Sequence, residues 1–109
     1  NLECYMHVIA RKIFNDATKK YPNDAKAIDD LYRLLKSGTF KDPSELRKVV
    51  PSLDNFKYKD KWWVVDIGGN NLRMIAFIEF KNSRVYVKHI VNHPDYDKLT
   101  ERYRKKELL

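Results

Sequence analysis

The sequence is poor in cysteine: Cys4 is the only one among 109 residues. A single thiol excludes an internal disulfide, and with it the small secreted scaffolds that depend on several disulfides. It also excludes a cysteine-rich metal site. We therefore expect a protein of a reducing compartment, the cytoplasm.

Long apolar runs are missing as well. No segment of the sequence is long and apolar enough to cross a membrane, and no secretory signal peptide is visible. There are no internal repeats, low-complexity stretches or linkers. A chain of 109 residues is enough for one domain with one core. We expect that domain to span residues 6–109, and residues 1–5, which precede Met6, to be an extension without a part in the fold.

Motifs of familiar catalytic centres are weak or absent. Gly68-Gly69 is followed by neither the lysine nor the helix of a phosphate-binding loop. His89 and His93 are four residues apart but fall across the end of a strand, so they do not share a helix face. We expect no metal site and no cofactor. No Ser-His-Asp spacing indicates a hydrolase that uses a serine nucleophile.

The chain does have a surplus of positive charge. It contains 22 Lys and Arg residues against 15 Asp and Glu residues, which gives a net charge of +7 and a pI near 9.5. This balance favours a polyanion or an acidic protein as partner. An excess of solvated surface lysines explains the charge equally well. Because 13% of the residues are aromatic, the chain is not a disordered basic tail.

The N-terminal half has the apolar period of helices. Three helices are predicted, within residues 6–21, 24–37 and 42–50. The first segment opens with a short apolar stretch that can form a strand, and then places Ile9, Ile13 and Ala17 on one helical stripe. Asp24 is the predicted N-cap of the second helix, and Gly38 its left-handed C-terminal residue. The third begins with a capping aspartate and a proline.

From Phe56 onward the apolar period changes to two, which indicates strands. Four strands are predicted, at residues 56–59, 62–67, 72–80 and 84–91. Gly68-Gly69 supplies the positive φ angles of a hairpin turn. Pro94 opens a C-terminal helix that runs to about Arg104. This order predicts an α+β fold, with the N-terminal helices packed on one face of an antiparallel four-stranded sheet.

Alternation sorts the strand residues into two faces. In the last strand, one face carries Val85, Val87, His89 and Val91, and the other carries Tyr86, Lys88 and Ile90. In the first strand, Lys57 and Lys59 share a face. Arg73 is unusual because it lies in mid-sheet. It needs either an internal carboxylate, from Glu79 or Asp66, or an external anion, and the sequence leaves both open.

Side chains able to transfer protons or bind phosphate lie on the predicted strands or just after the last one: Lys57, Arg73, His93 and Tyr96. RNA is cleaved when a 2′-OH attacks the adjacent phosphate, which requires a base, cations and an acid. His, Lys and Tyr move protons, and Arg offers a fork to phosphate oxygens. Together they predict a ribonuclease site without a metal. Singly, Lys57 fits a solvated lysine, His93 a helix cap and Tyr96 a packing residue.

Four segments closely resemble the HigB toxins of bacterial type II toxin–antitoxin systems, within the RelE-like family: Met6-His7-Val8-Ile9, residues 51–58, residues 68–73 and residues 93–97. The resemblance covers about residues 6–100. It implies the RelE-like microbial RNase fold and an mRNA interferase that cuts mRNA on translating ribosomes. It also implies silencing by a helix-turn-helix antitoxin, HigA-like, with operator DNA bound only through the toxin–antitoxin complex.

The resemblance also implies roles for single residues. Arg73 matches the arginine expected to hold the scissile phosphate, and Lys57 the lysine expected to act as a base or to contact a phosphate. His93 or Tyr96 would be the acid–base partner, and Tyr96 could also stack on a base. Further RNA contacts are expected from three residues: Lys59, Lys88 and Asp97.

Two other functions stay open on the sequence. The basic charge, together with Trp62, Trp63 and Tyr86, suits a non-catalytic RNA- or ribosome-binding module. The surface of Trp62 and Trp63 also suits a structural interaction domain. Strong RNA binding without cleavage would favour the first, and a neighbouring helix-turn-helix gene would favour the toxin.

Overall fold

In the structure, a computed structural model, residues 6–9 and 11–108 are described. Its elements follow in this order: β1 (His7–Ile9), α1 (Arg11–Lys20), η2 (Pro22–Asp24), α2 (Ala25–Ser37), α3 (Pro43–Val49), β2 (Asp54–Asn55), β3 (Trp62–Ile67), η3 (Gly68–Asn70), β4 (Leu72–Glu79), β5 (Arg84–Asn92) and α4 (His93–Arg104). This confirms the predicted α+β class. The expected extension, residues 1–5, lies outside the described residues.

The strands form one mixed sheet in the order β1-β5-β4-β3-β2. β1 is parallel to β5, and the other neighbours are antiparallel. The sheet therefore has one strand more than the four predicted. At one edge β1 is added beside β5, where the His7 backbone N–H donates to the Ser83 carbonyl at 2.7 Å. At the other edge β2, at Asp54–Asn55, stands in place of the strand predicted at residues 56–59. Ile9 belongs to β1 and is 42% exposed, so its predicted place on a helical stripe is wrong.

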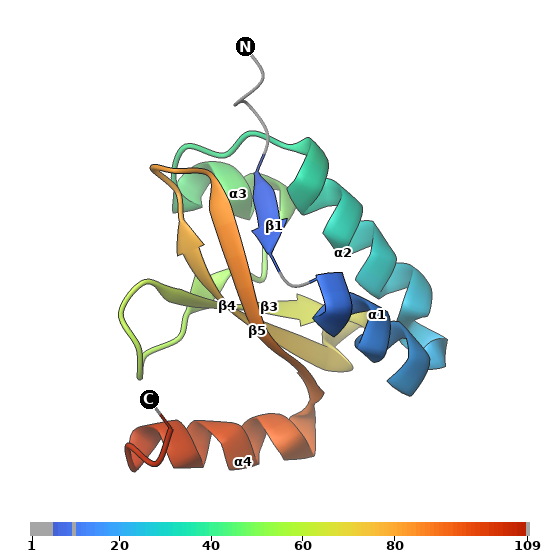
Figure 1. Cartoon of the computed structure of the whole chain (residues 1–109), viewed down its shortest axis with the longest axis vertical. Helices are drawn as coiled ribbons and strands as arrows, with labels where there is room; N and C mark the ends of the chain where they lie inside the picture. Colours follow the sequence, from blue (N-terminus) through green and yellow to red (C-terminus); the bar gives the residue numbers. More distant parts are fainter. Residues whose placement is uncertain (1–5, 10, 109) are drawn as a thin grey trace.

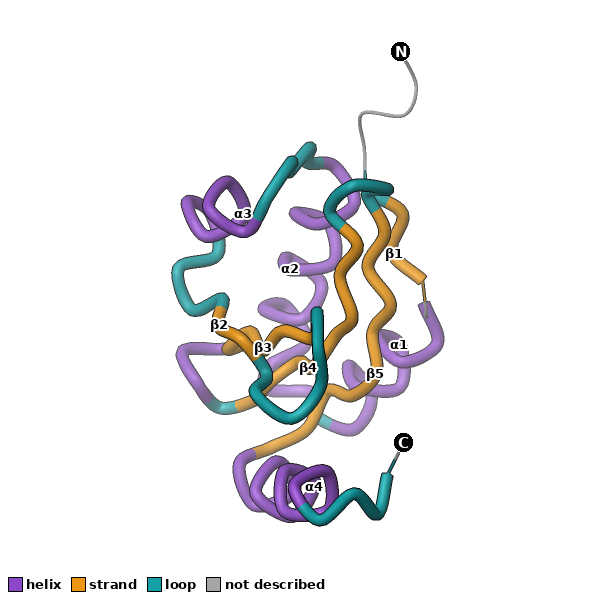
Figure 2. The backbone as a smooth tube through the Cα atoms, turned by 90° about the vertical axis from the view of Figure 1, so that its left-hand side faces the viewer, coloured by secondary structure: helices purple, strands orange, loops and turns teal. Residues whose placement is uncertain are grey.

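The helices cover both faces of the sheet (Figures 1 and 2). α1 and α2 pack side by side, and with α3 they close the main core against one face of β4 and β5. α4 runs back across the opposite face toward the turn before β3 (Figure 1). Two apolar clusters result, one on each side of the sheet. The described part of the chain contains no helix with the length and apolar character that spanning a membrane requires.

The helix ends were predicted with mixed success. Asp42 caps α3 as expected, because its side chain accepts a hydrogen bond from the Glu45 N–H at 2.9 Å. Asp24 precedes α2 but makes no capping hydrogen bond, and accepts instead from the Asn71 side chain at 3.1 Å. Gly38 is extended, with φ −98°, rather than left-handed. Glycine is required there for space, since a Cβ atom would lie 2.3 Å from the Phe40 ring.

Residues 56–61 form consecutive turns, and the strand predicted at 56–59 is wrong. The Lys59 N–H donates to the Phe56 carbonyl at 3.3 Å, and Lys61 has a positive φ of 62°. The alternation of Phe56 and Tyr58 resembles that of a strand. Their rings instead meet edge to face at 5.7 Å and join one aromatic cluster, so both face the same side.

A β-bulge at Lys88 shifts the alternation in β5. His89 pairs with Ile75, whereas Val87 pairs with the next residue of β4, so Lys88 is the extra residue. Ile90 consequently joins the main core, and His89 turns to the opposite face. The predicted grouping of His89 with Val87 is therefore wrong.

Candidate functional site

The face of the sheet that carries α4, here called the α4 face, consists of three rows of directly paired residues across β3, β4 and β5. The first row is Asp66, Arg73 and Val91; the middle row is Val64, Ile75 and His89; the last row is Trp62, Phe77 and Tyr86. Directly opposite residues and alternate residues along a strand point to the same side of a sheet. All the strand positions of the candidate site therefore lie on one surface.

Arg73 lies in the first row and is held by two neighbours. Its Nε lies 3.3 Å from Asp66 Oδ1, on the adjacent strand. That nitrogen is buried and makes no hydrogen bond within the described residues, so the contact is ionic. Its guanidinium carbon lies 4.7 Å from the centre of the Tyr96 ring. The side chain keeps 29% of its surface exposed, which leaves part of the guanidinium fork accessible to an anion.

His93, the first residue of α4, lies at the same end of the face. Its Nε2 is 2.5 Å from the carbonyl oxygen of Asn70, in the hairpin turn that precedes Arg73. A carbonyl oxygen only accepts, so Nε2 carries a proton and donates it. The alternative role as a helix cap is filled by Asn92, which accepts from the Asp95 N–H at 3.0 Å. The structure thus gathers His93 with Tyr96 and Arg73.

The hairpin turn at Gly68–Asn70 brings the Asn70 carbonyl close to His93. Gly68 and Gly69 have the predicted positive φ angles of 65° and 78°. A Cβ atom on Gly68 would lie 2.5 Å from Asp24 Oδ1, so the turn also packs against the start of α2. The turn fixes the register in which Asp66 faces Arg73.

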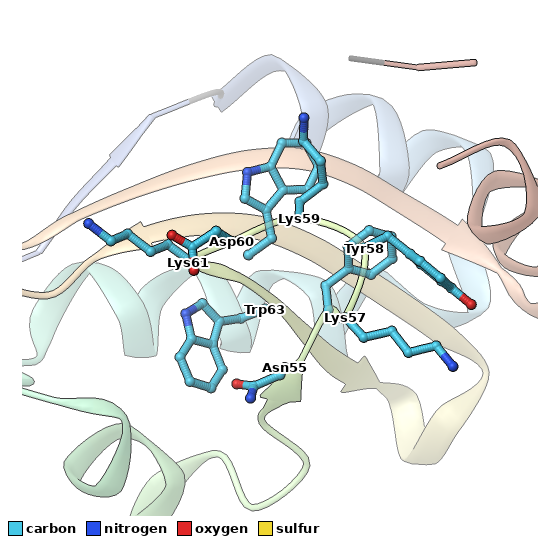
Figure 3. A pocket seen from close by; sticks show the side chains of 9 residues that line it. Asn55, Lys57, Tyr58, Lys59, Asp60, Lys61 and Trp63 are labelled. Atoms are coloured by element: carbon cyan, nitrogen blue, oxygen red, sulfur yellow. The ribbon is translucent and has the colours of Figure 1, made fainter. Parts of the chain in front are cut away.

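Lys57 lies apart, in the exposed turn between β2 and β3. Its ammonium group is 5.2 Å from the Tyr58 ring, and the two side chains extend the same way (Figure 3). Tyr58 and Tyr96 both pack against the cluster of Phe56, Val64, Ile75 and Tyr103. Lys57 therefore lies on the same side of the sheet as the Arg73 end, with this cluster between them.

α4 covers the middle row. Tyr103 packs on Ile75, and its hydroxyl is hydrogen-bonded to His89 Nε2 at 2.9 Å. Burial lowers the pKa of His89 below its usual value, and the neighbouring Lys88 adds to this effect. Burial raises the pKa of the Tyr103 hydroxyl. This pair holds α4 across the sheet. The sequence named His89 in the alternation of the last strand and in the metal-site question, but predicted no contact with Tyr103.

The three expected RNA contacts fall in different places. The ammonium groups of Lys59 and Lys88 lie 5.4 and 5.7 Å from the Trp62 ring, at the last row. Lys59 also lines an open hollow of about 590 Å³ at the turn, whose lining includes Trp63 (Figure 3). Asp97 is exposed on α4 and lines a separate hollow with other residues of that helix.

Two members of the site were not foreseen from the sequence. The Asn70 carbonyl that accepts from His93 is a backbone group without a sequence signal. Tyr103 follows Tyr96 by seven residues, a helical spacing that places both on one face of α4. Residues 6–9 and 11–108 contain no cluster of three or more His, Cys, Asp or Glu side chains placed to hold a metal ion.

The model of one protein family, described as HigB_toxin, the RelE-like toxic component of a toxin–antitoxin system, matches residues 24–99. That range is more than half of the chain. The protein belongs to the HigB toxin family.

Curated relatives agree with this assignment. The protein named mRNA interferase HigB from Escherichia coli O6:H1 strain CFT073 is 56% identical over 99 residues, which cover 91% of this chain and 96% of the relative. Two further relatives are the mRNA interferase toxin HigB of Escherichia coli K12 and the mRNA interferase HigB of Shigella flexneri. Each is 41% identical over 101 residues, which cover 93% of this chain and 97% of the relative. As a HigB-family chain, the protein is the toxin of a toxin–antitoxin pair.

Proposed function

We propose that this HigB-family toxin cleaves mRNA on the translating ribosome, without a metal ion, by attack of a 2′-OH on the adjacent phosphate. As a HigB-family toxin it is an endoribonuclease of the mRNA interferase class, in line with the names of its relatives. The observation that carries the finer proposal is the gathering of Arg73, His93 and Tyr96 at one end of the α4 face.

Arg73 is proposed to bind the scissile phosphate. Asp66 contacts its Nε and Tyr96 lies under its guanidinium plane, so the group is oriented before RNA arrives. Preorganised donors of this kind stabilise the charge that develops on the phosphate in the transition state. Lys57, exposed on its turn, is proposed to supply a second cation or the base.

The proposed reaction transfers two protons. The 2′-oxygen loses its proton to a base and bonds to phosphorus, and the bond from phosphorus to the 5′-oxygen breaks. The products are a 2′,3′-cyclic phosphate and a 5′-hydroxyl, whose oxygen takes a proton from an acid. His93 or Tyr96 is proposed as this acid. His93 Nε2 donates to Asn70, so its other ring nitrogen, Nδ1, is the atom left to exchange a proton with RNA.

The proposed RNA contacts extend to the last row of the same face and to the exposed side of α4. Lys59 and Lys88 can neutralise phosphates beside Trp62. Asp97, exposed on α4, can accept hydrogen bonds from base amino groups or ribose hydroxyls. The partners proposed are mRNA on the ribosome and a HigA-like helix-turn-helix antitoxin that silences the toxin, with operator DNA reached only through that complex. The net charge of +7 supports a polyanionic or acidic partner.

Cut-site mapping tests the proposed function. The purified toxin would be incubated with an mRNA alone, and with the same mRNA in a reconstituted translation reaction. The free-RNA arm would be repeated with a chelator of divalent cations, since translation itself needs magnesium. We expect new 5′-hydroxyl ends within the reading frame when ribosomes translate, and few or none on free mRNA. Equal cutting of free RNA that the chelator abolishes would contradict both the ribosome dependence and the metal-free chemistry.

A non-catalytic RNA- or ribosome-binding module is the second candidate. It is favoured by the Arg73–Asp66 pair, because that carboxylate already balances part of the arginine charge. The same assay separates the two functions. Tight binding to ribosomes with no new RNA ends would favour the binding module.

A further inference from the structure

The last row of the α4 face is entirely aromatic. Trp62, Phe77 and Tyr86 pair directly with one another across β3, β4 and β5. The Phe77 and Tyr86 rings lie 5.7 Å apart and are tilted by only 37°. All three side chains are partly exposed, so three rings line up across the sheet with accessible surface. This set is called the aromatic row below.

Two lysines lie at the Trp62 end of the aromatic row. The ammonium groups of Lys59 and Lys88 lie 5.4 and 5.7 Å from the centre of the Trp62 ring. Lys88 is the extra residue of the β-bulge and is exposed. Among the described residues, neither lysine forms an ion pair with a carboxylate. Their charge is therefore available to an anion from outside.

The aromatic row differs from the middle row beside it. There, Val64 and Ile75 are buried in the cluster that α4 closes with Tyr103. Trp62 touches the edge of this cluster, but Phe77 and Tyr86 lie beyond it. Phe77 is four positions after Arg73 in β4, which places the two about 13 Å apart at roughly 3.3 Å per residue.

We propose that the aromatic row is a base-stacking subsite for single-stranded RNA, which binds nucleotides next to the phosphate held at Arg73. The inference rests on the proposed function for the position of that phosphate. Aromatic side chains stack on any base, and basic residues beside them follow the backbone, which is the usual composition of surfaces that bind single strands. The subsite would bind with little sequence preference.

RNA suits this surface better than a protein partner does. Burying Lys59 and Lys88 against an apolar protein surface would remove their hydration without compensation. Phosphates would neutralise them, and the aromatic row continues directly into the face that carries Arg73. A protein interface is the competing outcome of the test.

The test measures RNA binding apart from cleavage. Fluorescence anisotropy would follow binding of a labelled 2′-O-methyl oligoribonucleotide, which has no 2′-OH to attack, at low ionic strength. The double variant Phe77→Leu/Tyr86→Leu keeps apolar volume but removes two stacking surfaces. We expect its Kd to rise at least fivefold, because one stacked base contributes ~1–3 kcal/mol, or about five- to 150-fold. Lys88→Ala should weaken binding and reduce its salt dependence.

Tyr32→Leu is the matched control. Tyr32 on α2 is also partly exposed and also has two cations over its ring, Arg11 at 4.3 Å and Lys36 at 5.7 Å, but it lies on the layer behind the sheet. This control should bind the oligonucleotide like the wild type. The single variants Phe77→Leu and Tyr86→Leu serve if the double variant does not fold.

Several results would overturn the subsite. They are wild-type affinity in the aromatic-row variants, an equal loss of affinity in Tyr32→Leu, and no binding by the wild type. Retained RNA binding with lost affinity for the antitoxin would instead identify a protein interface.

Failure of the proposed cleavage site can be told apart from failure of the subsite. If Arg73→Ala cuts mRNA like the wild type while the aromatic-row variants lose binding, the subsite stands and the cleavage site does not.

Discussion

β4 presents different chemistry on its two faces. Toward α1, α2 and α3 it contributes aliphatic side chains that are at most 3% exposed: Leu72, Met74, Ala76 and Ile78. Toward α4 it contributes Arg73, Ile75 and Phe77, of which only Ile75 is fully buried. One strand thus serves the core on one side and the site on the other. Substitutions on the two faces should therefore have separable effects on stability and on activity.

A core substitution on α2 gives the largest expected effect on stability. Leu35 is 1% exposed, and Leu35→Ala leaves a cavity in the main core that should cost about 2–5 kcal/mol of unfolding free energy. Denaturant titration measures this loss. The folded fraction should cleave mRNA at the wild-type rate. Val49→Ala is the control, because Val49 is 49% exposed and its loss should change stability by less than about 0.5 kcal/mol.

A substitution in the first row should give a smaller effect, on activity alone. Asp66→Asn keeps the shape of the side chain but removes the charge that orients Arg73. Since pairs this exposed are worth roughly 0.2–1 kcal/mol, cleavage in translation reactions should fall by about fivefold at most. Asp29→Asn, which disrupts a similar pair with Arg33 on α2, should leave cleavage unchanged. A loss of a hundredfold would mean that Asp66 itself takes part in the reaction.

The smallest expected effect is on the pH dependence of stability, through His89, which is hydrogen-bonded to Tyr103 of α4. Burial, and then Lys88, lowers the pKa of His89 from its usual 6.5. Below pH 6.5 the unfolded chain binds a proton at this position before the folded chain does, so unfolding free energy should fall as pH decreases through that range. His89→Gln should flatten this slope between pH 7 and pH 5. An unchanged slope in His89→Gln would contradict the assignment.

Much of the fold could be predicted from local signals. The Asp42-Pro43 helix start, the Gly68-Gly69 turn and the period-two strand Trp62–Ile67 each depend on neighbours in sequence, and each is confirmed. The place of Arg73 on the face opposite Leu72 and Met74 follows from the same alternation of strand residues. Local patterns suffice where a helix cap, a turn or a single strand determines the outcome.

The remaining features depend on contacts between distant residues. The bulge at Lys88 reverses the faces of β5 and brings His89 under Tyr103, which alternation alone cannot show. In the turn at residues 56–61, Phe56 packs on Tyr103, forty-seven positions later in the chain, a contact that no local pattern shows. For Arg73, the sequence named Asp66 and an external anion as alternatives. The structure shows the Asp66 pair, and also accessible guanidinium surface for an anion.

The central claim is that the partly exposed guanidinium of Arg73 binds the phosphate at which RNA is cut. The most direct measurement is the rate at which new mRNA ends form in translation reactions that contain the wild type, Arg73→Ala or Arg33→Ala, an exposed arginine of α2. Loss of one preorganised donor to a developing negative charge typically costs about 10²–10³ in rate. We predict a loss of that size for Arg73→Ala, with wild-type stability, and none for Arg33→Ala. Wild-type cleavage by folded Arg73→Ala would contradict the account.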